Sequence, residues 1–222
     1  MADGPIRLVM ADDDVLVRSG LTLIFDGEKD LTVVGQAGSG REALAVVEQT
    51  RPDVVIMDVR MPDMDGIEAT DAIVTRYPQG PRVLVLTTFE DSDYLYRTLR
   101  AGASGFLLKR ARPEELVHGV RVVAAGTSLV LPDLTRRLIA EHQPRTGARG
   151  AAALPQLTER EADVLSLVVA GLSNAEIANR LYLSTETIKT HLSRLLVKLN
   201  ARDRTQAVIV AYETGFVTPT GS

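Results

Sequence analysis

Acidic, hydroxyl and amine side chains each follow a short apolar run of this sequence. These residues and their runs are Asp12-Asp13-Asp14 after Ile6–Ala11, Asp58 after Val54–Met57, Thr87 after Val83–Leu86, and Lys109 after Phe106–Leu108. In a parallel α/β sheet, the carboxyl ends of the strands lie along one edge, where ligands bind. A carboxylate nucleophile, a metal-binding acid pair, a hydroxyl and a lysine are the groups needed to form and hold an aspartyl phosphate. The spacing therefore predicts a phosphorylation site at Asp58.

The acids Asp12-Asp13-Asp14 would repel one another in a folded protein unless a cation neutralised them. Mg²⁺ prefers such oxygen ligands and commonly bridges carboxylates and phosphate. We expect this metal close to Asp58, with Lys109 balancing the charge of the phosphoryl oxygens and Thr87 donating a hydrogen bond to one of them. Each residue alone would be an ordinary polar residue at a strand end. Four matching strand ends favour the functional interpretation.

Length and composition fit a protein of two ordinary domains. The 222 residues are 45% hydrophobic and 24% charged, so both halves can build a core. The formal net charge of -4 argues against coating nucleic acid or membrane by charge alone, although a local basic patch is compatible with it. The lack of cysteine excludes disulfides and thiol catalysis. No signal peptide and no apolar run of membrane-spanning length is visible, so we expect a cytoplasmic protein without a membrane partner.

Residues 6 to about 125 alternate short apolar runs with amphipathic stretches. This alternation predicts an α/β fold with a five-stranded parallel sheet covered on both faces. The expected strands are Arg7–Ala11, Thr32–Ala37, Val54–Met57, Val83–Thr87 and Gly105–Leu108. The expected helices are Val15–Phe25, Gly40–Thr50, Gly66–Arg76, Tyr94–Ala101 and Pro113–Ala125.

The segment Gly38–Ala43 also fits the loose dinucleotide-binding pattern G-x-G-x-x-A. It follows the second expected strand, however, and the first strand ends in acids that would repel a pyrophosphate. We therefore interpret Gly38 and Gly40 as a tight turn between a strand and a helix.

The sequence changes character after residue 127. Residues 128–154 are expected to be a linker, in which 133–142 could form a short helix and 143–153 contain no large apolar residue. From Leu157 onward the pattern is helical, and capping boxes mark two helix starts. The expected helices are Glu159–Ala170, Asn174–Leu181, Thr185–Leu199 and Arg204–Thr214. The two expected domains therefore span residues 4–127 and 155–219.

The expected helix Thr185–Leu199 has an apolar and a polar side. Its apolar stripe, at helical spacing, is Ile188, Leu192, Leu195 and Leu199. The opposite side carries Glu186, Lys189, Thr190, Ser193 and Val197, with Arg194 at its flank. Lysine, arginine and small hydroxyls suit the major groove of DNA. Spacing alone leaves an ordinary solvated helix face as an equal alternative.

Four motifs carry a resemblance to a known family: Ala11-Asp12-Asp13, the segment Asp58–Gly66, Leu86-Thr87-Thr88, and the segment Ala101–Lys109. With them, residues 6–125 resemble the receiver domain of bacterial two-component response regulators. The resemblance implies a flavodoxin-like (βα)5 fold and Asp58 as the phosphoacceptor. It implies Mg²⁺ held by Asp13, Asp58 and the backbone carbonyl of Arg60, with Asp12 helping mainly through water.

The same resemblance implies that Thr87 and Phe106 form a switch pair, in which the hydroxyl moves toward phosphate and the ring follows inward. Two residues depart from the family. Asp14 stands where relatives of this subgroup often have histidine, and Arg110 stands where many receivers have proline.

Three further motifs, Leu157–Glu161, Gly171–Ala178 and Ser184–His191, resemble the LuxR-type four-helix DNA-binding domain. Nearly the whole chain is thus similar to the NarL/FixJ family of response regulators. The resemblance makes Thr185–Leu199 the recognition helix of an all-α helix-turn-helix domain. Candidate base or groove contacts are Lys189, Thr190 and Ser193; candidate phosphate contacts are Arg194, Lys198 and Arg202; and the expected dimer surface is Val208, Ile209, Ala211 and Tyr212.

These features predict a transcription regulator that a sensor histidine kinase switches by phosphorylating Asp58, and that binds double-stranded DNA as a homodimer on activation. The receiver would assist only its own phosphoryl transfer and hydrolysis, so the protein would not be an enzyme in the usual sense. Two alternatives remain. A metal-dependent phosphotransferase would need a substrate pocket, for which no long insertion is visible, and an interaction module would use the C-terminal helices to bind protein.

Overall fold

The computed structural model describes residues 4–88, 92–126 and 155–217. The chain divides into two compact units between residues 129 and 130, and each is described by itself. The expected linker, residues 128–154, and the short helix expected within it lie outside the described residues. In the described ranges, no helix is long and apolar enough to cross a membrane.

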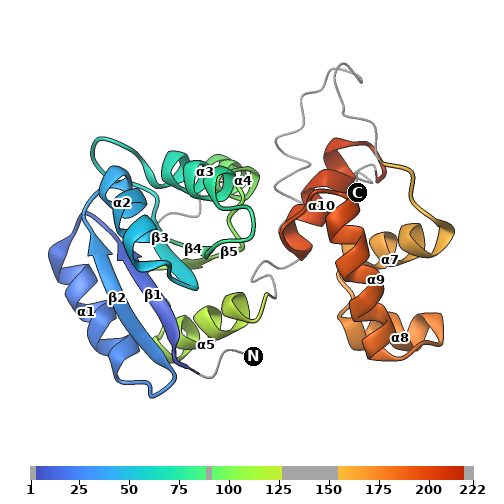
Figure 1. Cartoon of the computed structure of the whole chain (residues 1–222), viewed down its shortest axis with the longest axis horizontal. Helices are drawn as coiled ribbons and strands as arrows, with labels where there is room; N and C mark the ends of the chain where they lie inside the picture. The colour runs from blue at the N-terminus through green and yellow to red at the C-terminus, as the bar shows by residue number, and fades with distance from the viewer. Residues whose placement is uncertain (1–3, 89–91, 127–154, 218–222) are drawn as a thin grey trace. The chain divides into compact units, whose positions relative to one another are not determined.

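Five parallel strands form the sheet in the described part of the first unit, in the order β2-β1-β3-β4-β5 (Figure 1). The strands are β1 (Ile6–Ala11), β2 (Leu31–Ala37), β3 (Val54–Asp58), β4 (Arg82–Thr87) and β5 (Gly105–Leu108). The helices are α1 (Val15–Asp26), α2 (Gly40–Thr50), α3 (Gly66–Arg76), α4 (Ser92–Arg100) and α5 (Pro113–Ala124). The predicted alternation of strands and helices is therefore confirmed.

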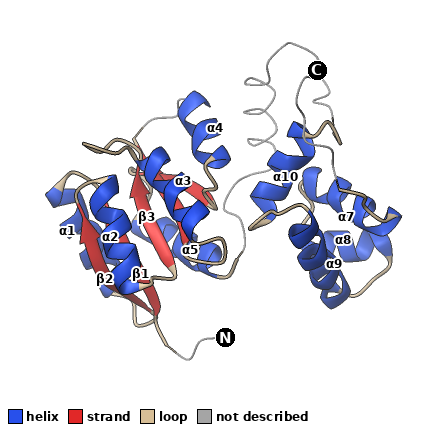
Figure 2. Cartoon of the chain, turned by 45° about the horizontal axis from the view of Figure 1, so that its top comes forward, coloured by secondary structure: helices blue, strands red, loops and turns tan. Residues whose placement is uncertain are grey.

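Alternate residues of the strands face opposite layers of helices. In β3, Val54 and Ile56 belong to the core that includes α1 and α5, whereas Val55 and Met57 belong to the core that includes α2 and α3. Figure 2 shows the sheet between these two layers. Because both faces are covered, the strands are nearly continuous apolar runs.

The carboxyl ends of four strands carry the polar residues that stand out in the sequence. Asp12 follows β1, Asp58 ends β3, Thr87 ends β4, and Lys109 follows β5. Since β1 pairs with β3, β3 with β4, and β4 with β5, all in parallel, these ends lie along one edge of the sheet. The topology thus brings together residues that are far apart in the chain.

The turn between β2 and α2 has a structural explanation. The Ser39 hydroxyl caps α2 by accepting a hydrogen bond from the N–H of Glu42 at 3.2 Å. The N–H of Gly40 donates to the carbonyl of Met64 at 3.2 Å, and a Cβ at residue 40 would lie 2.6 Å from that oxygen. Close packing against the loop before α3 therefore requires glycine here, which favours a turn over a pyrophosphate site.

The described part of the second unit contains four helices, as predicted. They are α7 (Glu159–Val169), α8 (Asn174–Leu181), α9 (Thr185–Lys198) and α10 (Arg204–Glu213). Both predicted capping boxes, Thr158 with Glu161 and Ser173 with Glu176, are present. The apolar stripe of α9 is buried at Ile188, Leu195 and Leu199, and half-buried at Leu192.

Candidate phosphorylation site and DNA interface

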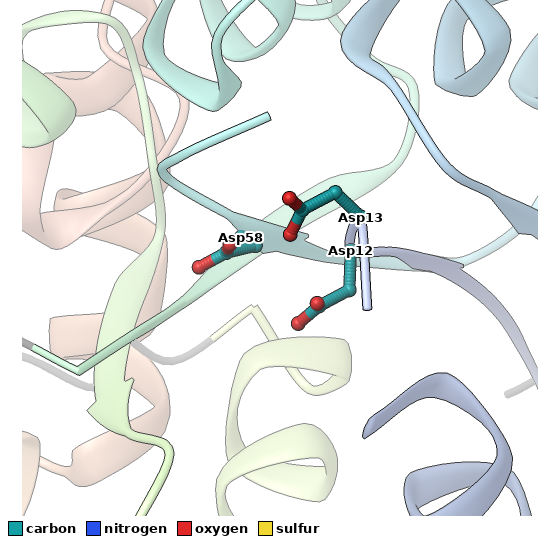
Figure 3. A group of neighbouring side chains, drawn as sticks. All are labelled: Asp12, Asp13 and Asp58. Carbon is teal, nitrogen blue, oxygen red and sulfur yellow. The ribbon is translucent and has the colours of Figure 1, made fainter. Parts of the chain in front are cut away.

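Three carboxylates converge at the carboxyl edge of the sheet (Figure 3). One oxygen from each of Asp12, Asp13 and Asp58 lies within 4.8 Å of the others. Asp12 and Asp58 are only 2% and 6% exposed, whereas Asp13 is exposed to solvent. A set of carboxylate oxygens, without sulfur or imidazole, suits Mg²⁺ better than a soft transition metal. The donor set therefore fits a magnesium site that solvent reaches at Asp13.

Lys109 neutralises part of this negative charge. Its Nζ lies 2.6 Å from Oδ2 of Asp12 and 3.2 Å from Oδ2 of Asp58. Burial alone would lower the pKa of Lys109, but the hydrogen bond to Asp12 and the charges of Asp58 and Asp12 outweigh it, so the pKa is raised. The backbone N–H of Lys109 donates to the carbonyl of Thr87 at 2.9 Å. The amine is thus charged and held within reach of Asp58.

Burial raises the pKa of Asp58 above its ordinary value of 3.8. The positive charge of Lys109 opposes this shift, the negative charge of Asp12 adds to it, and hydrogen bonds from Lys109 and the Val59 backbone oppose it. An acid with a raised pKa stabilises the fold most below its ordinary pKa, and that contribution is lost as the pH rises through the folded pKa. Ionised Asp58 is therefore under-neutralised, and a further cation nearby would stabilise it.

A small pocket of about 40 Å³ adjoins Asp58 and Lys109. Its lining residues are Asp58, Val59, Arg60, Thr87, Thr88, Tyr94 and Lys109. The guanidinium of Arg60 lies 5.5 Å from the centre of the Tyr94 ring, so these two side chains stack together. The sequence does not predict that Tyr94 lies at this pocket. Thr88 is indicated only by its position next to Thr87.

Asp14, the third acid of the run, caps a helix and does not belong to the carboxylate cluster. Its carboxylate accepts hydrogen bonds from the N–H groups of Leu16 and Val17, at 2.8 and 3.4 Å, and so caps α1. Its own N–H donates to Oδ1 of Asp12 at 3.0 Å. The departure from the family pattern at this position is therefore compatible with a well-formed helix start that also orients Asp12.

Gly66 lies against the backbone of Asp58, a contact that its place in the loop motif does not reveal. Its N–H donates to the carbonyl of Val59 at 2.9 Å. A Cβ at residue 66 would lie 1.8 Å from the carbonyl oxygen of Asp58, far inside any permitted contact. Asp65 caps α3 by accepting from the N–H of Glu68 at 2.7 Å. The loop folds back onto the end of β3 because residue 66 has no side chain.

The predicted switch residues lie on neighbouring strands. Thr87 is buried at the end of β4. Phe106 in β5 lies opposite Val85 of β4. Its ring is half-buried and packs against the core that includes α2 and α3. Arg110, the second departure from the family pattern, is exposed just after the strand. The positions fit the predicted pair, and the switch itself stays a prediction.

The helix α8, a short turn and α9 form a helix-turn-helix. Ser184 caps α9 by accepting from the N–H of Thr187 at 3.1 Å. The predicted groove-facing residues Lys189, Thr190 and Ser193, and the flanking Arg194, are all exposed. Lys189 Nζ lies 3.1 Å from Oε2 of Glu186, an exposed pair that contributes little stability. His191 is half-buried, in line with a packing role.

Lys198 is held by an ion pair that the sequence pattern does not reveal. Its Nζ lies 2.6 Å from Oε2 of Glu161. The same carboxylate accepts from the N–H of Thr158 at 2.9 Å, as part of the cap of α7. The pair therefore ties α9 to the start of α7. Lys198 remains exposed and Arg202 is half-buried, so their phosphate contacts stay predictions.

Glu161→Gln is expected to destabilise the second unit at neutral pH. The hydrogen bond from Lys198, followed by that from the Thr158 backbone, lowers the pKa of Glu161 from 4.5 to about 2. Stabilisation from a lowered acid pKa is present above the ordinary value and is lost as the pH falls through the folded value. Thermal unfolding followed by circular dichroism should therefore show a deficit that shrinks as the pH is lowered below 4.5. A deficit independent of pH would contradict the role of charge.

The residues of α10 that were predicted to form a dimer surface are largely buried in the single chain. The predicted dimer residues Val208, Ile209, Ala211 and Tyr212 are only 4%, 3%, 0% and 2% exposed. Side chains buried to this extent pack within the chain, and the dimer surface stays a prediction. Other residues of this helix are more accessible: Glu213 is exposed, and Gln206 and Val210 are half-buried.

An acidic, lysine-neutralised sheet edge and a helix-turn-helix in one chain point to a regulator that joins a receiver to a DNA-reading domain. Residues 8–121 match the response regulator receiver domain family, and residues 155–211 match the bacterial regulatory proteins of the luxR family. The chain belongs to the response regulators that carry a LuxR-type DNA-binding domain, and it is a transcription regulator.

Similar proteins span nearly the same length. The uncharacterized transcriptional regulatory protein YxjL of Bacillus subtilis (strain 168) is 41% identical over 213 residues, covering 96% of this chain and 97% of its own. The transcriptional regulatory protein DegU of Brevibacillus brevis is 38% identical, covering 97% and 96%. The crystal structure of the response regulator ChrA of a heme-sensing two-component system is 33% identical, with a TM-score of 0.52, covering 96% and 100%.

Proposed function

We propose that phosphorylation of Asp58 switches this transcription regulator. A sensor histidine kinase would donate the phosphoryl group, and the phosphorylated chain would bind double-stranded DNA as a homodimer. The observation that carries the proposal is the convergence of Asp12, Asp13, Asp58 and Lys109 at one edge of the sheet. These groups are a nucleophile, two further acids and a fixed cation, in a chain whose family couples a receiver to DNA.

Phosphoryl transfer to Asp58 would use a carboxylate oxygen as the nucleophile. A P–O bond would form to that oxygen while the P–N bond to the kinase histidine breaks, and the imidazole nitrogen would retain the electron pair and take up a proton. The Lys109 ammonium, 3.2 Å from Asp58, would balance the added negative charge. Thr87, which lines the adjoining pocket, would donate a hydrogen bond to a phosphoryl oxygen.

Asp13, Asp58 and the backbone carbonyl of Arg60 would hold Mg²⁺, with Asp12 contributing mainly through water. When bound, the ion supplies positive charge that offsets the phosphoryl oxygens. Support for this proposal comes from the charges present: three carboxylates share one close lysine, which leaves a net negative site. A divalent cation with a preference for oxygen satisfies that need.

Asp13→Asn is expected to lower the affinity for Mg²⁺ by at least about tenfold, because it removes an exposed ligand charge. Asp14→Asn is the matched control. Asparagine caps a helix about as well as aspartate, and Asp14 caps α1 outside the carboxylate cluster. Calorimetric titration of each full-length variant with magnesium chloride measures the difference. Equal losses in both variants would show that total local charge, and not Asp13, determines binding.

Phosphorylation would be transmitted through Thr87 and Phe106. A half-buried ring at the edge strand β5 can change its exposure when the neighbouring hydroxyl moves, and this would alter the surface of the receiver. The change would either release α9 for DNA or promote dimerisation of the receiver. Both routes end in paired second units, which suits a domain with no large excess of basic residues.

Lys189→Ala is expected to weaken DNA binding by about fivefold or more, since one contact of this kind contributes about 1–3 kcal/mol. Phosphorylation should be unaffected. Lys29→Ala, which removes an exposed lysine from the receiver, is the matched control. Gel shifts with genomic promoter fragments, with and without phosphodonor, measure binding. Equal binding by Lys189→Ala and wild type would contradict the groove contact, and a wild type that binds no fragment in either state would contradict the proposed function.

A further inference from the structure

Tyr182 lies in the turn between the two helices of the helix-turn-helix, where it combines an exposed side chain with a left-handed backbone. Its side chain is 95% exposed. Its backbone is left-handed, with φ 54° and ψ 45°, at the end of α8. Within the residues that the structure describes, its phenol makes no hydrogen bond. A large aromatic residue thus projects into solvent from a tight turn.

Folding gives no reason for tyrosine at this position. An exposed ring buries no apolar surface, and a left-handed backbone is unfavourable for a bulky L-residue. Asp63 and Asn200, which also have positive φ, belong to residue types that tolerate it better, whereas Arg51, at the end of α2, is the other bulky residue with positive φ. Glycine or asparagine would satisfy the turn equally well. The side chain therefore serves a purpose outside the fold of the free chain.

The position of Tyr182 indicates that purpose. Ser184, two residues later, caps α9, so Tyr182 lies beside the N-terminal end of the recognition helix. In helix-turn-helix proteins this end of the recognition helix enters the major groove. A residue just outside it lies next to the phosphates that border the groove. Tyrosine hydroxyls are among the side-chain donors that contact phosphate oxygens and fix the register of a protein on the duplex.

We propose that the phenolic O–H of Tyr182 donates a hydrogen bond to a DNA phosphate beside the groove that α9 enters. The inference rests on the proposed function, because it requires that α9 bind DNA. The contact positions the recognition helix and carries no base preference of its own. Removing it should weaken binding to every bound sequence by a similar factor.

The test compares Tyr182→Phe, which removes only the hydroxyl, with Tyr182→Asn, which removes the ring and suits a left-handed backbone. Full-length phosphodonor-treated protein is titrated against two promoter fragments of different sequence. Both variants should bind more weakly by about tenfold or more, as expected for a lost hydrogen bond to a charged group, and by the same factor on each fragment. Tyr96→Phe in α4 is the matched control and should bind as wild type. Thermal unfolding of Tyr182→Asn should show equal or greater stability.

The outcomes separate this inference from the proposed function. A wild type that binds neither fragment overturns both. If Tyr182→Phe binds DNA with wild-type affinity, the hydroxyl contact is overturned and the proposed function is not. This holds even if Tyr182→Asn binds weakly, because the loss would then come from the missing ring. Normal DNA binding with lost transcriptional activity would also overturn it, and would assign Tyr182 to a protein partner such as the polymerase. A loss confined to one fragment would contradict a phosphate contact.

Discussion

The Asp58→Asn protein should take up no measurable phosphate from acetyl phosphate or a sensor kinase, a loss of at least about a hundredfold. Asparagine keeps the shape of the side chain, but its amide is a poor nucleophile toward phosphorus. Incubation with Mg²⁺ and phosphodonor, followed by a phosphate-affinity gel, measures the uptake. Because burial and the charge of Asp12 raise the pKa of Asp58, the neutral amide should leave thermal stability at neutral pH unchanged or higher.

Asp63→Asn is the matched control for this loss. It makes the same substitution in the adjoining loop, at an exposed residue whose φ of 64° asparagine tolerates as well as aspartate. It should be phosphorylated at the wild-type rate. Undiminished uptake by Asp58→Asn would identify another acid as the acceptor and overturn the site.

Gly66→Ala is expected to lower the free energy of unfolding by about 3 kcal/mol, at the upper end of the usual cost of overpacking. The added Cβ would lie 1.8 Å from the carbonyl oxygen of Asp58 and 2.8 Å from its carbon. The loop must move away, which breaks the hydrogen bond from residue 66 to Val59 and shifts the backbone of Asp58. Chemical denaturation should show the loss of stability, and the gel assay should show slower phosphorylation at temperatures where the variant is folded.

The same substitution at residue 20, Gly20→Ala, is expected to raise the free energy of unfolding. Gly20 lies within α1, and no heavy atom lies within 4 Å of a Cβ built there. Alanine is the better helix former, so this variant should gain about 0.5–1 kcal/mol. If both variants were stabilised, the close approach of Gly66 to Asp58 would be refuted.

The positions of Asp58, Thr87 and Lys109 could be predicted because a doubly covered sheet imposes a simple pattern. In β1, β3, β4 and β5 an apolar run leads to the carboxyl end, and the first polar residue after that run marks the edge where ligands bind. The sequence does not reveal contacts that depend on loop paths. Tyr94 reaches the pocket from α4, and Gly66 reaches Asp58 by a reversal of the loop. Both depend on how segments fold back in three dimensions.

The burial of four residues of α10 was not predicted, for a related reason. Its apolar residues Val208, Ile209, Ala211 and Tyr212 are nearly consecutive, so they mark no single stripe along the helix. A helix that is apolar on most sides is usually buried, and its residues cannot be divided from sequence into a core side and a dimer side. The pairing of Lys198 with Glu161 was equally hidden, because the partners lie 37 residues apart.

The two lysines of α9 each have an acidic neighbour already, Glu186 for Lys189 and Glu161 for Lys198. An ammonium that is already paired with a carboxylate gains less free energy from binding a phosphate. Its binding therefore contributes less to the salt dependence that counterion release produces. The decline of DNA affinity with rising ionic strength should therefore be shallower than the five basic residues between positions 189 and 204 would suggest. A contact of Lys198 with the duplex would compete with the ion pair that holds Lys198 at the first turn of α7.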